Sequence, residues 1–164
     1  MIEFVMAKSK DDIEEIRRLF LEYAGSLDFD LCFQDFDREL RELPGEYAEP
    51  DGRLILAKCD GRCVGCVGLR RLEGDICEMK RLYVKPDYRG TGIGRELASR
   101  IIAEARAIGY RRMRLDTISD MVEAITLYRS LGFVEIDPYR PNPIDGAKYF
   151  ELKLREDRSE PAPQ

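Results

Sequence analysis

Apolar residues recur along the chain with two different spacings, and each spacing predicts one kind of element. Runs in which apolar residues alternate or follow one another predict seven strands, at residues 2–6, 53–58, 63–69, 75–84, 112–116, 133–136 and 148–154. Apolar residues at every third or fourth position predict four helices, at residues 10–25, 35–43, 92–108 and 121–131. Ser9 is the expected N-cap of the first helix, and Gly109 and Gly132 are expected to end the last two.

The order of these elements indicates the fold class. Two early strands flank Asp60-Gly61, which is typical of a β-hairpin turn, whereas the later strands alternate with helices. This combination predicts a mixed α/β (α+β) sheet flanked by helices, in a single domain over residues 1–154. Residues 155–164 are charged and then proline-rich, so we expect a disordered tail.

Composition narrows the chemistry. The 164 residues include no histidine, which excludes a Ser-His-Asp or Cys-His catalytic pair and any His-ligated metal. The net charge of −5 argues against a nucleic-acid-binding surface and against a polybasic membrane anchor. The first residues lack a signal-peptide pattern and the five cysteines are odd in number, so a cytoplasmic protein with reduced thiols is expected.

Three of the cysteines, Cys59, Cys63 and Cys66, form a cluster that has two interpretations. One is a thiolate metal site, and the other is a pair of hairpin strands with ordinary buried cysteines. Cys63 and Cys66 are three residues apart, so on a regular strand they face opposite sides of the sheet. No second Cys-x-x-Cys follows, and we therefore expect no metal site.

The segment 89–94, with the sequence Arg-Gly-Thr-Gly-Ile-Gly, joins a predicted strand to the longest predicted helix. Three alternating glycines let backbone N–H groups approach one anion, and the helix N-terminus adds unpaired N–H groups and partial positive charge. A phosphate or pyrophosphate site follows from these features. The segment lacks the lysine of a P-loop, and its third glycine comes one residue too early for a dinucleotide fingerprint. The alternative is a tight turn that happens to need several glycines.

Two segments carry a resemblance to a known family. Arg-Gly-x-Gly-x-Gly, after a strand that ends in Leu82-Tyr83-Val84, closely resembles motif A of the GNAT superfamily of N-acetyltransferases. Residues 127–133, Leu-Tyr-Arg-Ser-Leu-Gly-Phe, resemble motif B, and the order of elements is similar across residues 1–154. The resemblance implies a mostly antiparallel central sheet of the acyl-CoA N-acyltransferase fold, with acetyl-CoA as co-substrate.

The same resemblance implies how the donor is held. Backbone groups of Leu82 and Val84, with Tyr83 between them, would pair with the pantetheine arm as an added strand does. The pyrophosphate would rest on the backbone N–H groups of the glycine-rich loop, which are those of Arg89, Gly90, Thr91, Gly92, Ile93 and Gly94. Arg95, in the first helical turn, either adds charge to the same anion or is solvated.

Two residues are candidates for proton transfer. Glu78 stands where the superfamily often carries its catalytic glutamate, and we expect burial to raise its pKa into the range of a general base. The alternative is a strand-surface charge paired with Lys80 or Arg81. Tyr128, in the motif B segment, is the candidate acid for the departing thiolate, because its phenol has a similar basicity. The alternative for Tyr128 is a core aromatic.

The acceptor is less well defined. Asp116, at the end of a strand, either binds an ammonium group or holds a neighbouring loop. Arg140, with Tyr139 and Asn142, is expected in a wall of the acceptor pocket, where it either binds a substrate carboxylate or is a surface charge. A small amine or amino-acid-like acceptor is therefore expected. The alternatives are a protein lysine or N-terminus, or a non-catalytic acyl-CoA sensor. Superfamily members often form homodimers, which no segment of this chain tests.

Overall fold

The computed structural model describes residues 1–27, 35–142 and 144–155, and within them one sheet of seven strands in the order β1-β2-β3-β4-β5-β7-β6. Neighbouring strands are antiparallel except β4 and β5, which are parallel. The mixed, mostly antiparallel sheet is thereby confirmed. The strands are β1 (Ile2–Met6), β2 (Arg53–Cys59), β3 (Arg62–Glu73), β4 (Ile76–Val84), β5 (Arg112–Ile118), β6 (Val134–Ile136) and β7 (Ala147–Lys153).

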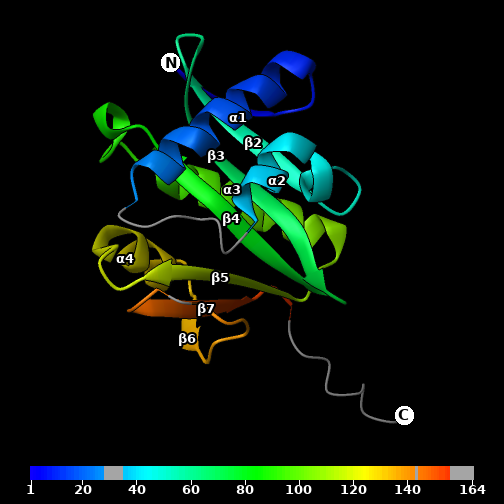
Figure 1. Cartoon of the computed structure of the whole chain (residues 1–164), viewed down its shortest axis with the longest axis vertical. Coiled ribbons are helices and arrows are strands. Elements are labelled where there is room, and N and C mark those ends of the chain that lie inside the picture. The colour runs from blue at the N-terminus through cyan, green and yellow to red at the C-terminus, as the bar shows by residue number, and fades with distance from the viewer. Residues whose placement is uncertain (28–34, 143, 156–164) are drawn as a thin grey trace.

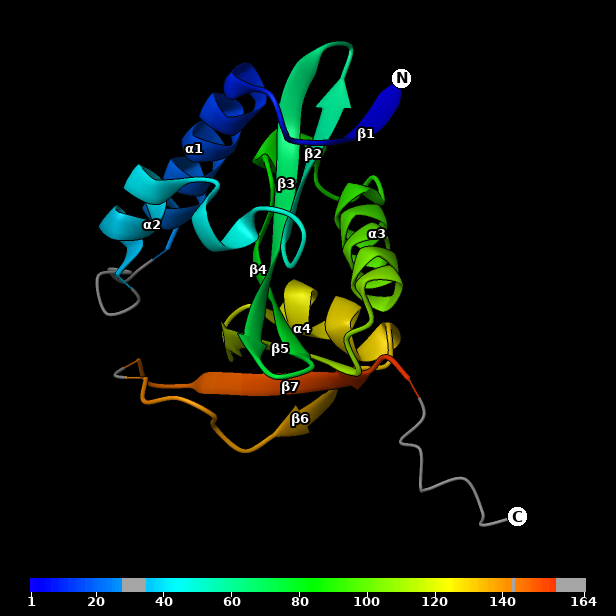
Figure 2. The ribbon, with the colours of Figure 1, turned by 90° about the vertical axis from the view of Figure 1, so that its right-hand side faces the viewer.

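Helices cover both faces of the sheet. Figure 2 shows α1 and α2 on one side of β2, β3 and β4, with α3 on the other side. None of the helices in the described ranges is long and apolar enough to cross a membrane. The helices are α1 (Lys10–Gly25), α2 (Phe36–Glu42), α3 (Ile93–Ile108) and α4 (Val122–Ser130), with 3-10 turns η2 (Gly45–Tyr47) and η3 (Pro86–Tyr88).

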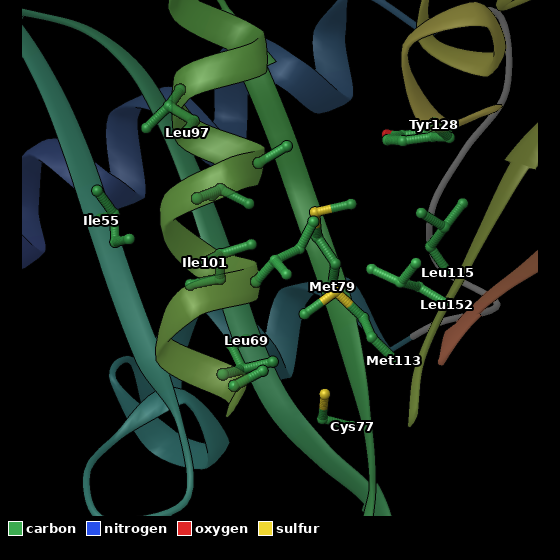
Figure 3. Packing of buried hydrophobic residues seen from close by; sticks show 14 of the residues in the cluster. Ile55, Leu69, Cys77, Met79, Leu97, Ile101, Met113, Leu115, Tyr128 and Leu152 are labelled. Carbon is green, nitrogen blue, oxygen red and sulfur yellow. The ribbon is translucent and has the colours of Figure 1, made fainter. Parts of the chain in front are cut away.

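Each face of the sheet has its own hydrophobic cluster. Leu97 and Ile101 of α3 pack into a cluster with Leu69, Met79 and Tyr128, part of which is drawn in Figure 3. On the opposite face, α1 contributes to a second cluster that includes Phe20, Leu56 and Tyr47. The periodic apolar positions of α1 and α3 therefore bury against the two sides of one sheet, as an amphipathic helix requires.

Most sequence-based element bounds agree with the structure within a few residues. The side chain of Ser9 caps α1 by accepting from the backbone N–H of Asp12 at 3.0 Å. The expected opposite orientation of Cys63 and Cys66 is wrong, since both pack against the α1 cluster. The register of β2 and β3 shifts between Ala57 and Lys58, and this irregularity changes the alternation. Residues 156–164 of the expected disordered tail, and Cys32, lie outside the described residues.

An irregularity in β4 opens the middle of the sheet. Cys66 pairs with Tyr83 and Gly68 with Lys80, so β4 carries one extra residue there, and Arg81 has a φ of 61°. Beside this bulge, the β4–β5 ladder ends after three residue pairs, the last of which joins Glu78 to Arg114. Beyond that pair the two strands separate, as Figure 1 shows. A bulge bends its strand and increases the local twist, which accounts for the separation.

Candidate active site

A cleft of about 750 Å³ opens where β4 and β5 separate. Its walls come from β4, the loop after it, the first turn of α3, the end of β5 and α4. Eleven of the sixteen predicted site residues line it, namely Leu82, Tyr83, Val84, Arg89, Gly90, Gly92, Gly94, Arg95, Asp116, Tyr128 and Asn142. The other five predicted residues, which are Glu78, Thr91, Ile93, Tyr139 and Arg140, are not among the lining residues.

The glycine-rich loop forms one end of the cleft. Gly90 and Gly92 have φ values of 77° and 89°, a conformation that residues with a Cβ adopt only with strain. No atom lies within 4 Å of where a Cβ would stand on either glycine. The first helical hydrogen bond of α3 runs from the N–H of Glu96 to the carbonyl of Gly92 at 3.0 Å. The N–H groups of the preceding first-turn residues therefore have no partner within the helix, which is the arrangement that binds anions at helix N-termini.

Two arginines flank this loop. The Nε of Arg89 donates to the carbonyl of Val84 at 2.8 Å, which ties the loop to the end of β4. The guanidinium of Arg95 donates to the Oγ of Ser130 at 2.6 Å and so connects the start of α3 to the end of α4. Both arginines line the cleft and add positive charge at the end of it that the glycine-rich loop forms.

Glu78 is fully buried and held by four polar groups. Its Oε1 accepts from Nε and Nη2 of Arg70 at 3.1 and 3.0 Å. Its Oε2 accepts from the hydroxyl of Tyr139 at 2.7 Å and from Arg140. Burial alone raises the pKa of Glu78, but the charges of Lys80, Arg140 and Arg70 outweigh burial and hold that pKa below its ordinary value. The expectation that burial raises the pKa of Glu78 is therefore wrong, because the sequence does not show which cations surround the carboxylate.

The loop before β7 is docked onto the sheet by charge. Arg140 contacts Glu78 and also lies 3.8 Å from Oδ2 of Asp116, so one guanidinium joins carboxylates on β4 and β5. The carbonyl of Arg140 accepts from the hydroxyl of Tyr149 at 3.1 Å. Asn142 uses its side-chain oxygen to accept from the N–H of Ile144 at 2.9 Å and lines the cleft. Arg140 and Asp116 thus place opposite charges together at the junction of β4, β5 and this loop.

Tyr128 lies on α4 among the aromatic rings of Phe133 and Phe150 and still lines the cleft. Burial raises the pKa of Tyr128 above its ordinary value, and Tyr23 and Asp116 add to the shift. The raised pKa keeps the proton on Tyr128 in the neutral range, but the expected match with the basicity of the thiolate is wrong, because burial makes the phenol a weaker acid than its ordinary pKa implies. The residue is both a core aromatic and a group exposed to the cleft, so the two sequence-based alternatives do not exclude one another.

Several residues of the cleft are not among the site residues predicted from the sequence. Tyr23, near the end of α1, and Lys80 and Arg81, on β4, line it. Arg81 is itself paired with Glu39 of α2 at 2.8 Å. No periodicity indicates these positions, because the bulge at Arg81 turns its neighbours toward the cleft and a β-bulge leaves no apolar pattern of its own. The sequence signal for this region is an arginine next to a lysine within a predicted buried strand, because such residues are almost never fully buried unless they are paired.

The chain is similar in sequence to several known proteins. An uncharacterized N-acetyltransferase of Schizosaccharomyces pombe is 36% identical over 155 residues, which cover 93% of this chain and 95% of that protein. IAA acetyltransferase of Azospirillum brasilense is 41% identical over 101 residues, or 59% of this chain and 66% of that protein. N-acetylaspartate synthetase of Xenopus tropicalis is 33% identical over 106 residues, or 64% of this chain and 39% of that protein.

A solved structure shares the fold. An acetyltransferase of Salmonella typhimurium, whose structure contains its cofactor acetyl-CoA, superposes with a TM-score of 0.71 and 21% identity over 99% of both chains. Residues 13–133 of the present chain also match the family model for acetyltransferases of the GNAT type. That match covers most of the domain, including β4, the glycine-rich loop and α4. The chain therefore belongs to the acetyltransferase (GNAT) family and is an N-acetyltransferase that depends on acetyl-CoA.

Proposed function

We propose that the protein transfers the acetyl group of acetyl-CoA directly to the amine of a small acceptor that also carries a carboxylate. The observation that supports this most strongly is the pairing of Asp116 with Arg140, 3.8 Å apart beside the cleft. An ammonium group suits Asp116 and a carboxylate suits the guanidinium of Arg140. An amino-acid-like molecule presents both charges a few atoms apart. A relative that is an N-acetylaspartate synthetase by name supports the same acceptor class.

The donor side of the proposal rests on backbone groups. The pyrophosphate of acetyl-CoA would accept hydrogen bonds from the loop 89–94 and the first turn of α3, with Arg95 adding charge. The pantetheine arm would lie along the β4 edge at Leu82 and Val84, on the side where β5 has moved away. Acetyl-CoA would supply the activated thioester, which would face the acceptor end of the cleft.

The reaction moves protons as well as the acetyl group. The acceptor enters as an ammonium ion, because primary amines have pKa values near ~10 in water. A base must remove one proton before the nitrogen attacks the thioester carbon. As the C–N bond forms and the C–S bond breaks, Tyr128 would give its phenolic proton to the departing thiolate. For Glu78 to act as the base, its bonds to Arg70, Tyr139 or Arg140 must open when the acceptor binds.

A thiol-release assay with paired acceptors tests the acceptor class. Each pair contains an amino acid and the amine that remains when its carboxylate is removed, and peptides with a free N-terminus or lysine complete the panel. We expect kcat/KM to be at least about 10-fold higher for the carboxylate-bearing member, since one charge-assisted contact stabilises by about 1.5–3 kcal/mol. A preference for peptides, or equal rates within pairs, would refute the proposal.

A variant pair ties this preference to Arg140. Arg140→Met should remove the discrimination within each pair while the Kd for CoA stays within about twofold. Arg38→Met is the matched control, because Arg38 pairs with Glu42 on the exposed surface of α2. We further propose that the enzyme works in a reducing compartment such as the cytoplasm, which the four free cysteines of the described ranges support.

A further inference from the structure

One guanidinium holds two carboxylates at the acceptor end of the cleft. Arg140 donates through Nη2 to Oε2 of Glu78, and its Nη1 lies 3.8 Å from Oδ2 of Asp116. Asp116 lines the cleft, whereas Glu78 is completely buried and is not among the lining residues. Asp116 is also the residue at which we place the ammonium group of the acceptor. Arg140 therefore takes up the cation position between two carboxylates that the acceptor ammonium needs.

The two arginines that bond to Glu78 differ in how firmly they are fixed. Arg70 donates to Oε1 through Nε and Nη2 at 3.1 and 3.0 Å, and it stands on β3 within the sheet, where it also bonds to Glu46. Arg140 instead stands in the loop between β6 and β7, and its side chain is 19% exposed. A long side chain on a loop can change its rotamer without breaking a strand ladder. Arg140 is thus the cation that can leave Glu78.

The departure of Arg140 has to be balanced by another charge. It leaves Glu78 and Asp116 with one counter-charge fewer in a buried place, which is costly. A simple amine supplies a cation but leaves the displaced guanidinium without its carboxylates. A molecule with both an ammonium and a carboxylate balances the exchange, because its ammonium replaces the guanidinium and its carboxylate pairs with the displaced Arg140. The net charge of the site is then unchanged.

The exchange also changes Glu78. Burial raises the pKa of Glu78, while Lys80, Arg140 and Arg70 lower it. The bonds of Arg70 to Oε1 can stay in place, since that oxygen is not shared with Arg140. Departure of Arg140 opens a lone pair on Oε2 and removes one of the cations that make the carboxylate a weak base. The acceptor ammonium enters at this same oxygen.

We propose that Arg140 is a placeholder cation for the acceptor ammonium, and that an acceptor needs its own carboxylate to exchange places with it. The proposal rests on the function proposed above. After the exchange, Glu78 takes one proton from the acceptor ammonium, and the free amine attacks the thioester carbon. The C–N bond forms, the C–S bond breaks, and the thiolate takes the proton of Tyr128. The amide nitrogen gives its second proton to the Tyr128 phenolate, and Glu78 releases its proton to solvent as Arg140 returns.

Removal of Arg140 distinguishes a placeholder from a residue that only binds carboxylate. Thiol release is measured with alanine against ethylamine, and with phenylalanine against phenethylamine. In Arg140→Met the amines no longer displace a bound guanidinium, so their kcat/KM should rise by about 10-fold, the factor for one charge-assisted contact. The amino acids lose both the contact that must break and the contact that forms, so their kcat/KM should stay within about threefold. A simple carboxylate-binding residue gives the reverse, with slower amino acids and unchanged amines.

The gain with amines should depend on Glu78. In the double variant Arg140→Met, Glu78→Gln the gain should disappear, because a neutral amide does not serve as a base. Arg53→Met is the matched control, since Arg53 has an 18% exposed side chain and pairs with Glu104 away from the cleft. The control should match the wild type with every acceptor. A Kd for CoA within about twofold of the wild type shows that each variant folds, and Arg140→Gln replaces Arg140→Met if the latter binds no CoA.

The outcomes separate the exchange from the acceptor class. Amines that are unchanged or slower in Arg140→Met, while the wild type still prefers amino acids, would overturn the placeholder role alone. A gain that persists without Glu78 would overturn it as well. A wild type that treats both members of each pair alike, or that prefers peptides, would refute the acceptor class proposed above and the exchange with it.

Discussion

The proposed donor and acceptor halves of the cleft offer different kinds of groups to a ligand. The donor half, residues 82–95, is one continuous stretch of chain that presents backbone amides and glycines. The acceptor half consists of Glu78, Lys80, Asp116 and the loop 139–142, which come from three separate parts of the chain and present charged side chains. Backbone recognition depends on the conformation of a single loop. Side-chain recognition depends on the whole sheet bringing distant charges together.

This difference predicts how each half responds to substitution. The donor half tolerates changes of side chain at most positions but not a change of backbone conformation. In the acceptor half, Glu78 bonds to Arg70, Tyr139 and Arg140, and Arg140 also pairs with Asp116, so removal of Glu78 takes a partner from several buried groups at once.

The largest effect is expected from Glu78→Gln in the acceptor half. The neutral amide leaves Arg70 and Arg140 without their shared counter-charge, and we expect a loss of about 3 kcal/mol in the free energy of unfolding. Urea denaturation measures this loss, while isothermal titration should show a nearly unchanged Kd for CoA. Glu96→Gln is the control, since its exposed pair with Arg100 should contribute under about 0.5 kcal/mol. A loss for Glu78→Gln as small as that of the control would contradict the charge network.

The same variant has a defined pH dependence. The pKa of Glu78 is lower in the folded state than its ordinary value near ~4.3 in the unfolded chain. Its ionised form therefore stabilises the fold fully above about pH 4.3, and this contribution disappears as the pH falls through the folded-state pKa. The stability difference between wild type and Glu78→Gln should accordingly shrink below about pH 4. A stability difference that instead grows as the pH falls would contradict the lowered pKa of Glu78.

The next largest effect concerns Tyr128, which stands between the two halves. Tyr128→Phe should lower kcat by about 100-fold, because the thiolate then departs without a positioned proton donor. The Kd for CoA and the KM of the acceptor should change little. Tyr110→Phe is the control, as the hydroxyl of Tyr110 donates to the carbonyl of Asp51 away from the cleft. Turnover equal to that of the control would remove Tyr128 from the mechanism.

A smaller effect is expected in the donor half. Gly92→Ala should weaken CoA binding by about 10-fold, since a Cβ at positive φ costs about 1–2 kcal/mol and shifts the loop away from the anion. Gly109→Ala is a close match, because Gly109 also has a positive φ, 115°, at the other end of α3. The control should lose stability without losing CoA affinity. Equal loss of CoA affinity in both variants would indicate a general effect on α3 and not on the loop.

The contrast between the halves also explains what the sequence could predict. Strands, helices and the glycine-rich loop depend on local spacing, and their predicted bounds agree closely with the structure. The cleft itself depends on the bulge at Arg81 and on the short β4–β5 ladder, neither of which leaves a periodic signal. The pKa direction of Glu78 was predicted wrongly because Arg70 and Arg140 reach it from residues 8 and 62 positions away. Long-range charge pairing is set by the fold and not by neighbours in sequence.

The early end of the β4–β5 ladder has a further consequence for the fate of the protein in the cell. The sheet is open where β4 and β5 separate. A ligand that binds in this opening raises the free energy of unfolding by an amount that rises with the logarithm of ligand concentration. Acetyl-CoA at 100 times its Kd would add about 2.7 kcal/mol to the stability of the folded chain. Loss of the donor would then raise the unfolded fraction of the protein, and with it the exposure of the chain to proteolysis.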